Sequence, residues 1–251
     1  MSVVPANWPA MSIAQAHAML TAPGQMFEME EVDVRGVRYR TWKNAPKSLR
    51  EVLAFGRMLH GPKDFVVYEA ERVSFEGFYR ASVAFAHKLI EAGVQKGDRV
   101  AVIMRNLPEW PVAFFGASLT GAIVAPLNAW WTGSELEYAL NDSGAKVAIV
   151  DAERLARLQE HLHAIPGLQR IYVTRATEEI AHPSVHRLED AIGSPTGYAD
   201  LPEQAVPAVP IDPEDDATLF YTSGTTGRPK GALGTHRNAG INVLNTAVAT
   251  V

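Results

Sequence analysis

The stretch that decides the fold of this chain is residues 217–231, which read Ala-Thr-Leu-Phe-Tyr-Thr-Ser-Gly-Thr-Thr-Gly-Arg-Pro-Lys-Gly. An apolar segment, 217–221, leads directly into ten residues that are all hydroxyl-bearing, glycine, proline or cationic. A strand that opens into such a loop suits a polyphosphate, because glycine allows positive φ and a close approach of the backbone to a ligand. Successive N–H groups can then form an anion-binding concavity. The order of residues therefore predicts a loop that holds a nucleoside triphosphate.

Two commoner nucleotide loops do not match this stretch. The P-loop of NTPases needs Gly-Lys at a fixed offset from its first glycine, and neither Gly224 nor Gly227 has it. No G-x-G-x-x-G motif occurs, which argues against a dinucleotide-binding enzyme. An ordinary Ser/Thr/Gly turn is the plain alternative, but the motif is too long and dense for that interpretation to be favoured.

At Tyr221–Gly231 the chain resembles the adenylate-forming superfamily, which contains acyl- and aryl-CoA ligases, adenylation domains of peptide synthetases, and luciferases. Every position of the family signature is matched in this segment. Members of the family also have a histidine shortly after the loop, and His236 occupies that position here. Looser likeness occurs at 93–101, 106–110 and 121–128, so the resemblance covers about 74–251.

The resemblance implies activation of a carboxylic acid by ATP, with Mg²⁺, to an acyl-adenylate, followed by transfer to the thiol of coenzyme A. Lys230 would screen the phosphate charge, Thr225 would reach Mg²⁺, and His236 would lie where the acyl group meets the adenylate. An alternative for His236 is a residue at the N-terminus of a helix, beside a Thr235 cap. Arg228 occupies the variable slot, where a solvated side chain is favoured, and Pro229 would fix the backbone before Lys230. The residues expected to cradle the β- and γ-phosphates are Thr222, Ser223, Gly224, Thr225, Thr226 and Gly227, and the wider nucleotide-binding set adds Arg228, Pro229 and Lys230.

Composition excludes several classes of protein. The chain has 251 residues, of which 47% are hydrophobic and 20% charged, as in ordinary globular proteins. A net charge of -5 provides no basic field for nucleic acid, and the absence of cysteine excludes a disulfide scaffold. The apolar run 112–127 is too short for a transmembrane segment, and no secretory signal precedes the chain's first elements, so a cytoplasmic location is expected.

Helix and strand patterns alternate from Ser74 onward, which predicts an α/β fold with a largely parallel sheet flanked by helices. The expected units are a lead segment 1–60, an α/β subdomain 61–173, a Pro-rich connection 174–216, and a segment 217–251 with strand, loop and helix start. The lead segment is expected to hold a hairpin turning at Gly36 and a helix over 48–59. Further along, the patterns predict helices over 75–89, 108–119, 134–141 and 152–163, and strands over 99–104, 123–124, 146–150 and 170–173.

The apolar stripe after Thr235 reaches the last residue with no stop signal, so the chain is expected to be the N-terminal part of a longer ligase of the fatty-acid–CoA type. The ribose-binding and C-terminal catalytic elements of the family have no counterpart in it, and the fragment alone is expected to be inactive. Two alternatives stay open. One is an adenylation domain that loads a carrier protein, and the other is a nucleotide-binding module without catalysis.

Overall fold

The computed structural model describes residues 11–180, 182–222 and 227–249. Near the N-terminus, the hairpin that the sequence predicts is formed by β1 and β2, which turn at Arg35 and Gly36, both with positive φ. The elements of this lead segment are α1 (Ile13–Leu20), β1 (Met29–Val34), β2 (Val37–Trp42) and α2 (Leu49–His60).

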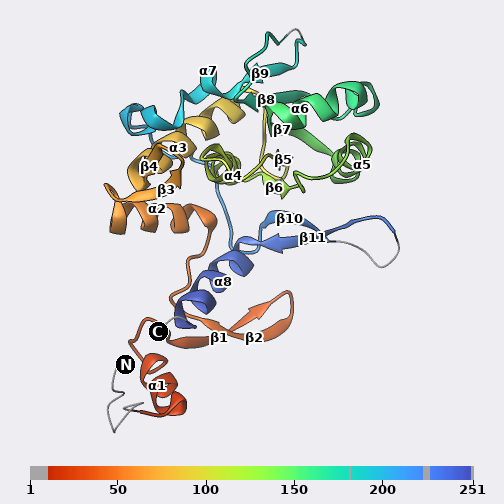
Figure 1. The fold of residues 1–251 in the computed structure, drawn as a ribbon. Helices are drawn as coiled ribbons and strands as arrows, with labels where there is room; N and C mark the ends of the chain where they lie inside the picture. The colour runs from red at the N-terminus through yellow and green to blue at the C-terminus, as the bar shows by residue number, and fades with distance from the viewer. Residues whose placement is uncertain (1–10, 181, 223–226, 250–251) are drawn as a thin grey trace, which may run out of the picture.

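A seven-stranded sheet forms the centre of the structure, in the order β11-β10-β6-β5-β7-β8-β9 (Figure 1). Neighbouring strands are parallel except for β10 and β11, which pair antiparallel at one edge. This confirms the predicted α/β fold with its largely parallel sheet. The strands are β5 (Arg99–Ile103), β6 (Ile123–Pro126), β7 (Ala145–Asp151), β8 (Arg170–Thr174), β9 (Val185–Arg187), β10 (Asp216–Thr222) and β11 (Lys230–Thr235).

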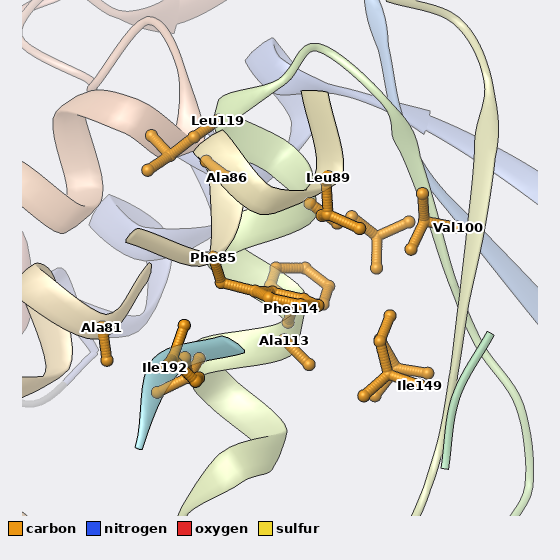
Figure 2. Packing of buried hydrophobic residues seen from close by; sticks show 14 of the residues in the cluster. Ala81, Phe85, Ala86, Leu89, Val100, Ala113, Phe114, Leu119, Ile149 and Ile192 are labelled. Carbon is orange, nitrogen blue, oxygen red and sulfur yellow. The ribbon is translucent and has the colours of Figure 1, made fainter. Parts of the chain in front are cut away.

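Helices cover both faces of the sheet, so the central strands carry apolar side chains on both of their faces. Because side chains alternate along a strand, Val100 and Val102 of β5 face the core shared with α3 and α4, while Ala101 and Ile103 face the core shared with α5 and α6. Figure 2 shows the first of these cores, in which Phe85 lies among aliphatic side chains from several elements. The helices that flank the sheet are α3 (Phe75–Glu91), α4 (Glu109–Leu119), α5 (Gly133–Ser143), α6 (Ala152–Leu158) and α7 (Leu188–Ile192).

Local capping chemistry sets the ends of α3 and α5. The Ser74 hydroxyl accepts from the Gly77 N–H at the start of α3. Thr132 and Glu135 form a reciprocal capping box at the start of α5. At the end of α5, Gly144 takes the left-handed conformation that a helix C-terminus favours, with φ of 61°.

Two stretches differ from the expected pattern. The helix predicted over 152–163 is α6 followed by a 3₁₀ helix, η1 (Gln159–Ala164), which packs against α5. The Pro-rich stretch 174–216, expected to be extended, contains β9, α7 and a second 3₁₀ helix, η2 (Pro195–Asp200). A short hairpin, β3 (Asp64–Tyr68) and β4 (Glu71–Ser74), was also not predicted. The division of the chain into four units stays a prediction.

The last described helix, α8 (His236–Val248), connects the sheet edge to the β1–β2 hairpin (Figure 1). Its Leu244 packs with Phe27 and Trp42 in a small separate core. Trp42 Nε1 also donates a 2.7 Å hydrogen bond to Asn245 Oδ1. None of the described helices has the length and apolar character needed to cross a bilayer.

Candidate functional site: the loop between β10 and β11

The predicted phosphate loop joins two paired strands. Thr222, the last residue of β10, lies opposite Lys230, the first residue of β11. The loop therefore leaves and returns at neighbouring points of the sheet edge. The sequence did not predict β11, and 217–251 thus holds two strands before its helix. Ser223, Gly224, Thr225 and Thr226 lie outside the described residues, so the roles assigned to them stay predictions.

The described part of the loop contains the features that an anion needs. Gly227 has φ of 94°, which only glycine adopts readily. Lys230 is exposed, and no carboxylate in the described part of the chain forms an ion pair with it. The exposed Thr222 has its hydroxyl near the Lys230 carbonyl, at 3.5 Å. An unpaired cation, a hydroxyl and a glycine with positive φ fit a polyphosphate.

Helix α5 forms hydrogen bonds with the residues at both ends of the loop. Tyr138 OH donates a 3.3 Å hydrogen bond to the Pro229 carbonyl, which fixes the backbone directly before Lys230. Tyr221 OH donates a 2.7 Å bond to Asp142 Oδ2, which fixes the backbone before Thr222. Burial, and then the hydrogen bond to Asp142, raise the pKa of Tyr221, so this hydroxyl keeps its proton.

The sequence did not identify Tyr138 and Asp142 as parts of the site. They stand 91 and 79 residues from their partners, and each is an ordinary surface residue type for a helix. Their only common signal is an i, i+4 spacing, which places them on the same helix face. Contacts with a loop cannot be derived from that spacing.

Arg228 occupies the variable slot of the motif, and its side chain turns toward α5. Its guanidinium carbon lies 5.1 Å from the centroid of the Tyr138 ring, a cation–π distance. The side chain is also exposed to solvent. Arg228 thus rests on Tyr138, whereas Lys230 forms no ion pair with any described carboxylate.

Mg²⁺ would be expected to arrive with the nucleotide. Among the described residues, no three His, Cys, Asp or Glu side chains come together as a metal site. Mg²⁺ keeps several water molecules and takes substrate phosphates with one or two protein ligands. The exposed Thr222 hydroxyl and Lys230, which pairs with no carboxylate of the described residues, fit this mode of binding, in which the triphosphate itself brings the metal. The part of Thr225 in it stays a prediction.

His236 lies at the other end of β11 from the loop. Six residue steps along a strand separate it from Lys230, which corresponds to ~20 Å. The imidazole is fully buried, and its Nδ1 accepts a 3.2 Å hydrogen bond from the Leu49 N–H. Burial lowers the pKa of His236, so the ring is neutral with its proton on Nε2.

The structure therefore does not bring His236 and Lys230 together. His236 is the first residue of α8, directly after Thr235, whose hydroxyl caps the helix. Its bond to Leu49 joins α8 to the start of α2. This favours the alternative interpretation, a residue at a helix N-terminus that connects two elements.

A basic ladder holds the chain that leads into β10. We use this name for Arg50, Arg57, Arg80, His87 and Lys96, whose side chains contact the irregular segment 201–215. Arg50 alone donates to the carbonyls of Leu119, Pro207 and Val209, over 2.9–3.4 Å. At the end of the segment, Lys96 Nζ lies 2.6 Å from Asp215 Oδ2, directly before β10 begins.

Comparisons with known proteins agree with this arrangement. A family model described as AMP-binding enzyme matches residues 58–251. A long-chain-fatty-acid–CoA ligase of Escherichia coli is 37% identical over 186 residues, which cover 67% of this chain and 33% of the ligase. A 4-coumarate–CoA ligase of Oryza sativa is 35% identical over 166 residues, or 63% of this chain and 28% of that protein. The chain thus spans about a third of the length of the curated relatives it matches.

Solved structures show the same likeness. A long-chain-fatty-acid–CoA ligase of Archaeoglobus fulgidus superposes with a TM-score of 0.67 and 27% identity, covering 82% of this chain and 40% of the ligase. An anthranilate–CoA ligase in complex with anthranoyl-AMP superposes with a TM-score of 0.64 and 27% identity, covering 76% of this chain and 35% of that structure.

Proposed function

Because the chain belongs to the AMP-binding enzyme family, we propose that the protein that carries it activates a carboxylic acid and joins it to coenzyme A. In the first step the carboxylate attacks the α-phosphorus of ATP, which gives an acyl-adenylate and pyrophosphate. In the second step the thiol of coenzyme A attacks the acyl carbon, and AMP leaves. A fatty or related acid is the proposed substrate, since relatives at 37% and 35% identity are ligases for long-chain fatty acids and for 4-coumarate.

One observation carries this proposal: the β10–β11 hairpin presents Lys230, which no described carboxylate pairs, three residues after Gly227 with its positive φ. During the first step, negative charge grows on the departing pyrophosphate. A cation and N–H groups already held in position stabilise that charge without reorganisation, and one such donor contributes ~3 kcal/mol in comparable oxyanion sites. The hydrogen bonds from Tyr138 to the Pro229 carbonyl and from Tyr221 to Asp142 support this by fixing both ends of the loop.

Replacement of Lys230 tests the proposal. In the protein that carries this chain, Lys230→Ala is expected to lower acid-dependent ATP–pyrophosphate exchange by about a hundredfold, because the departing charge loses its cation. The matched control is Arg228→Ala, which removes an exposed cation two residues away that rests on Tyr138. This control is expected to keep most of the activity. Exchange that is unchanged in Lys230→Ala would overturn the proposal.

A further inference from the structure

Two tyrosine hydroxyls connect the ends of the loop to α5. Tyr138 OH lies 3.3 Å from the Pro229 carbonyl oxygen, and Tyr221 OH lies 2.7 Å from Asp142 Oδ2. Tyr138 and Asp142 are one helical turn apart, so both bonds join the loop to the same face of one helix. The two ends of the loop are therefore positioned by a single rigid element.

The Tyr138 hydroxyl acts on the peptide group that leads into Lys230. The Pro229 carbonyl and the Lys230 N–H belong to one planar peptide group, so a bond to this oxygen orients the backbone at Lys230. Lys230 also pairs with Thr222 across the hairpin. These two restraints fix the backbone of Lys230, while its exposed side chain is available to an anion.

Gly231 explains how the Tyr221 ring reaches α5. The two residues lie directly opposite each other in the hairpin. A Cβ atom at residue 231 would lie 3.4 Å from Cζ of Tyr221 and 2.7 Å from Cδ1 of Leu219, so the end of the phenol ring passes over this glycine. The Trp131 ring meets Tyr221 edge-on, with the centroids 6.2 Å apart. A branched side chain at residue 231 would therefore displace the Tyr221 hydroxyl from Asp142.

We propose that Tyr138 and Tyr221 are positioning residues, whose hydroxyls hold Lys230 where negative charge develops on the departing pyrophosphate, and that Gly231 leaves the space that Tyr221 needs. A cation held in position stabilises developing charge without reorganisation, so a displaced Lys230 loses part of its effect although its charge remains. This inference rests on the proposed function, since it takes Lys230 to act on pyrophosphate.

Removal of each hydroxyl tests the proposal. Tyr138→Phe keeps the ring on which Arg228 rests and removes only the bond to Pro229. In the protein that carries this chain, kcat of ATP–pyrophosphate exchange is expected to fall about tenfold, the effect of one hydrogen bond. KM for ATP is expected to change less than about twofold, because the charge that Lys230 stabilises develops in the transition state. Tyr221→Phe is expected to give the same pattern.

A double-mutant cycle separates positioning from a general loss of structure. In the Lys230→Ala protein, Tyr138→Phe is expected to lower exchange no further, because no cation remains to be positioned. Gly231→Val is expected to lower exchange as Tyr221→Phe does and to add little to it, since both changes remove the bond to Asp142. The control is Tyr39→Phe, a 53% exposed tyrosine of β2, which is expected to leave exchange unchanged.

An unchanged kcat in Tyr138→Phe or in Tyr221→Phe would overturn the inference. A decrease by the same factor with and without Lys230 would also overturn it, because the hydroxyl would then act on the structure and not through the cation. Failure of the proposed function gives a different result, since exchange would then be unchanged in Lys230→Ala itself. Exchange that depends on Lys230 but on neither hydroxyl would refute the inference alone.

Discussion

At the scale of single residues, the two ends of β11 show how burial decides a role. Lys230 is exposed at one end and has no carboxylate partner among the described residues, so its charge is available to a ligand. His236, at the other end, is fully buried and already accepts a bond from the Leu49 N–H. Both residues are typical of active sites, but only the first is in an environment that leaves it free to bind an anion.

The buried His236 predicts a loss of stability in acid. Burial lowers its pKa in the folded protein below the ordinary value of 6.5, so the unfolded chain takes up the proton first. Above pH 6.5 this histidine therefore does not lower the free energy of unfolding, and below pH 6.5 the free energy of unfolding falls. The total decrease is about 1.4 kcal/mol for each unit by which folding lowers the pKa of His236. His236→Asn keeps an acceptor for Leu49 and removes the titration.

Urea unfolding at about pH 7.5 and about pH 5.5 measures this difference. The decrease in unfolding free energy between the two pH values is expected to be smaller in His236→Asn than in the unaltered protein. His186, whose pKa is also lowered by burial, is present in both proteins and cancels in the comparison. An equal decrease in the two proteins would contradict the prediction.

At the scale of elements, the join between β7 and α6 depends on a buried ion pair. Arg154 is 1% exposed, and its Nη1 lies 3.1 Å from Asp151 Oδ2. The Asp151 carboxylate also caps α6 and accepts from the Arg105 N–H, while Arg154 Nε donates to the Ala129 carbonyl. The pair therefore ties the carboxyl ends of β5 and β7 to the helix that follows and to the chain after β6.

Arg154→Met leaves the Asp151 carboxylate buried without its cation. Removal of one partner of a buried pair costs about 3–5 kcal/mol, so the midpoint of urea unfolding is expected to fall strongly. The control is Arg38→Met, whose partner Glu31 is 66% exposed, and there the loss should be about 1 kcal/mol or less. Equal losses in the two variants would show that burial of the pair is not the cause.

At the scale of the whole molecule, the basic ladder joins distant parts of the chain to the sheet edge. Arg50 lies near the start of α2, yet its guanidinium holds the carbonyls of Leu119, Pro207 and Val209 together. Segment 201–215, which it anchors, continues directly into β10 and so into the loop. The position of the candidate site therefore depends on side chains more than 150 residues away in the sequence.

Arg50→Met is expected to loosen this segment. Hydrogen bonds from a charged donor contribute about 1.5–3 kcal/mol each, and the three carbonyls share one Nη2, so a loss of about 2 kcal/mol in unfolding free energy is expected. Amide hydrogen exchange should also become faster from residue 205 to residue 215. Lys88→Met is the control, because its exposed ion pair with Glu91 stays within α3. Unchanged exchange in Arg50→Met would contradict the structural role of the ladder.

The sequence by itself determined the features that depend on neighbouring residues. Alternating helix and strand patterns, the Ser74 and Thr132 caps, and the glycine-rich loop after Phe220 all follow from local conformational preference and from short-range hydrogen bonds. Only the tertiary structure decided the pairing of β11, the support of the loop by α5, and the burial of His236. The physical reason is that these contacts join residues that are far apart in the chain, and their energy is gained only when whole elements pack against one another.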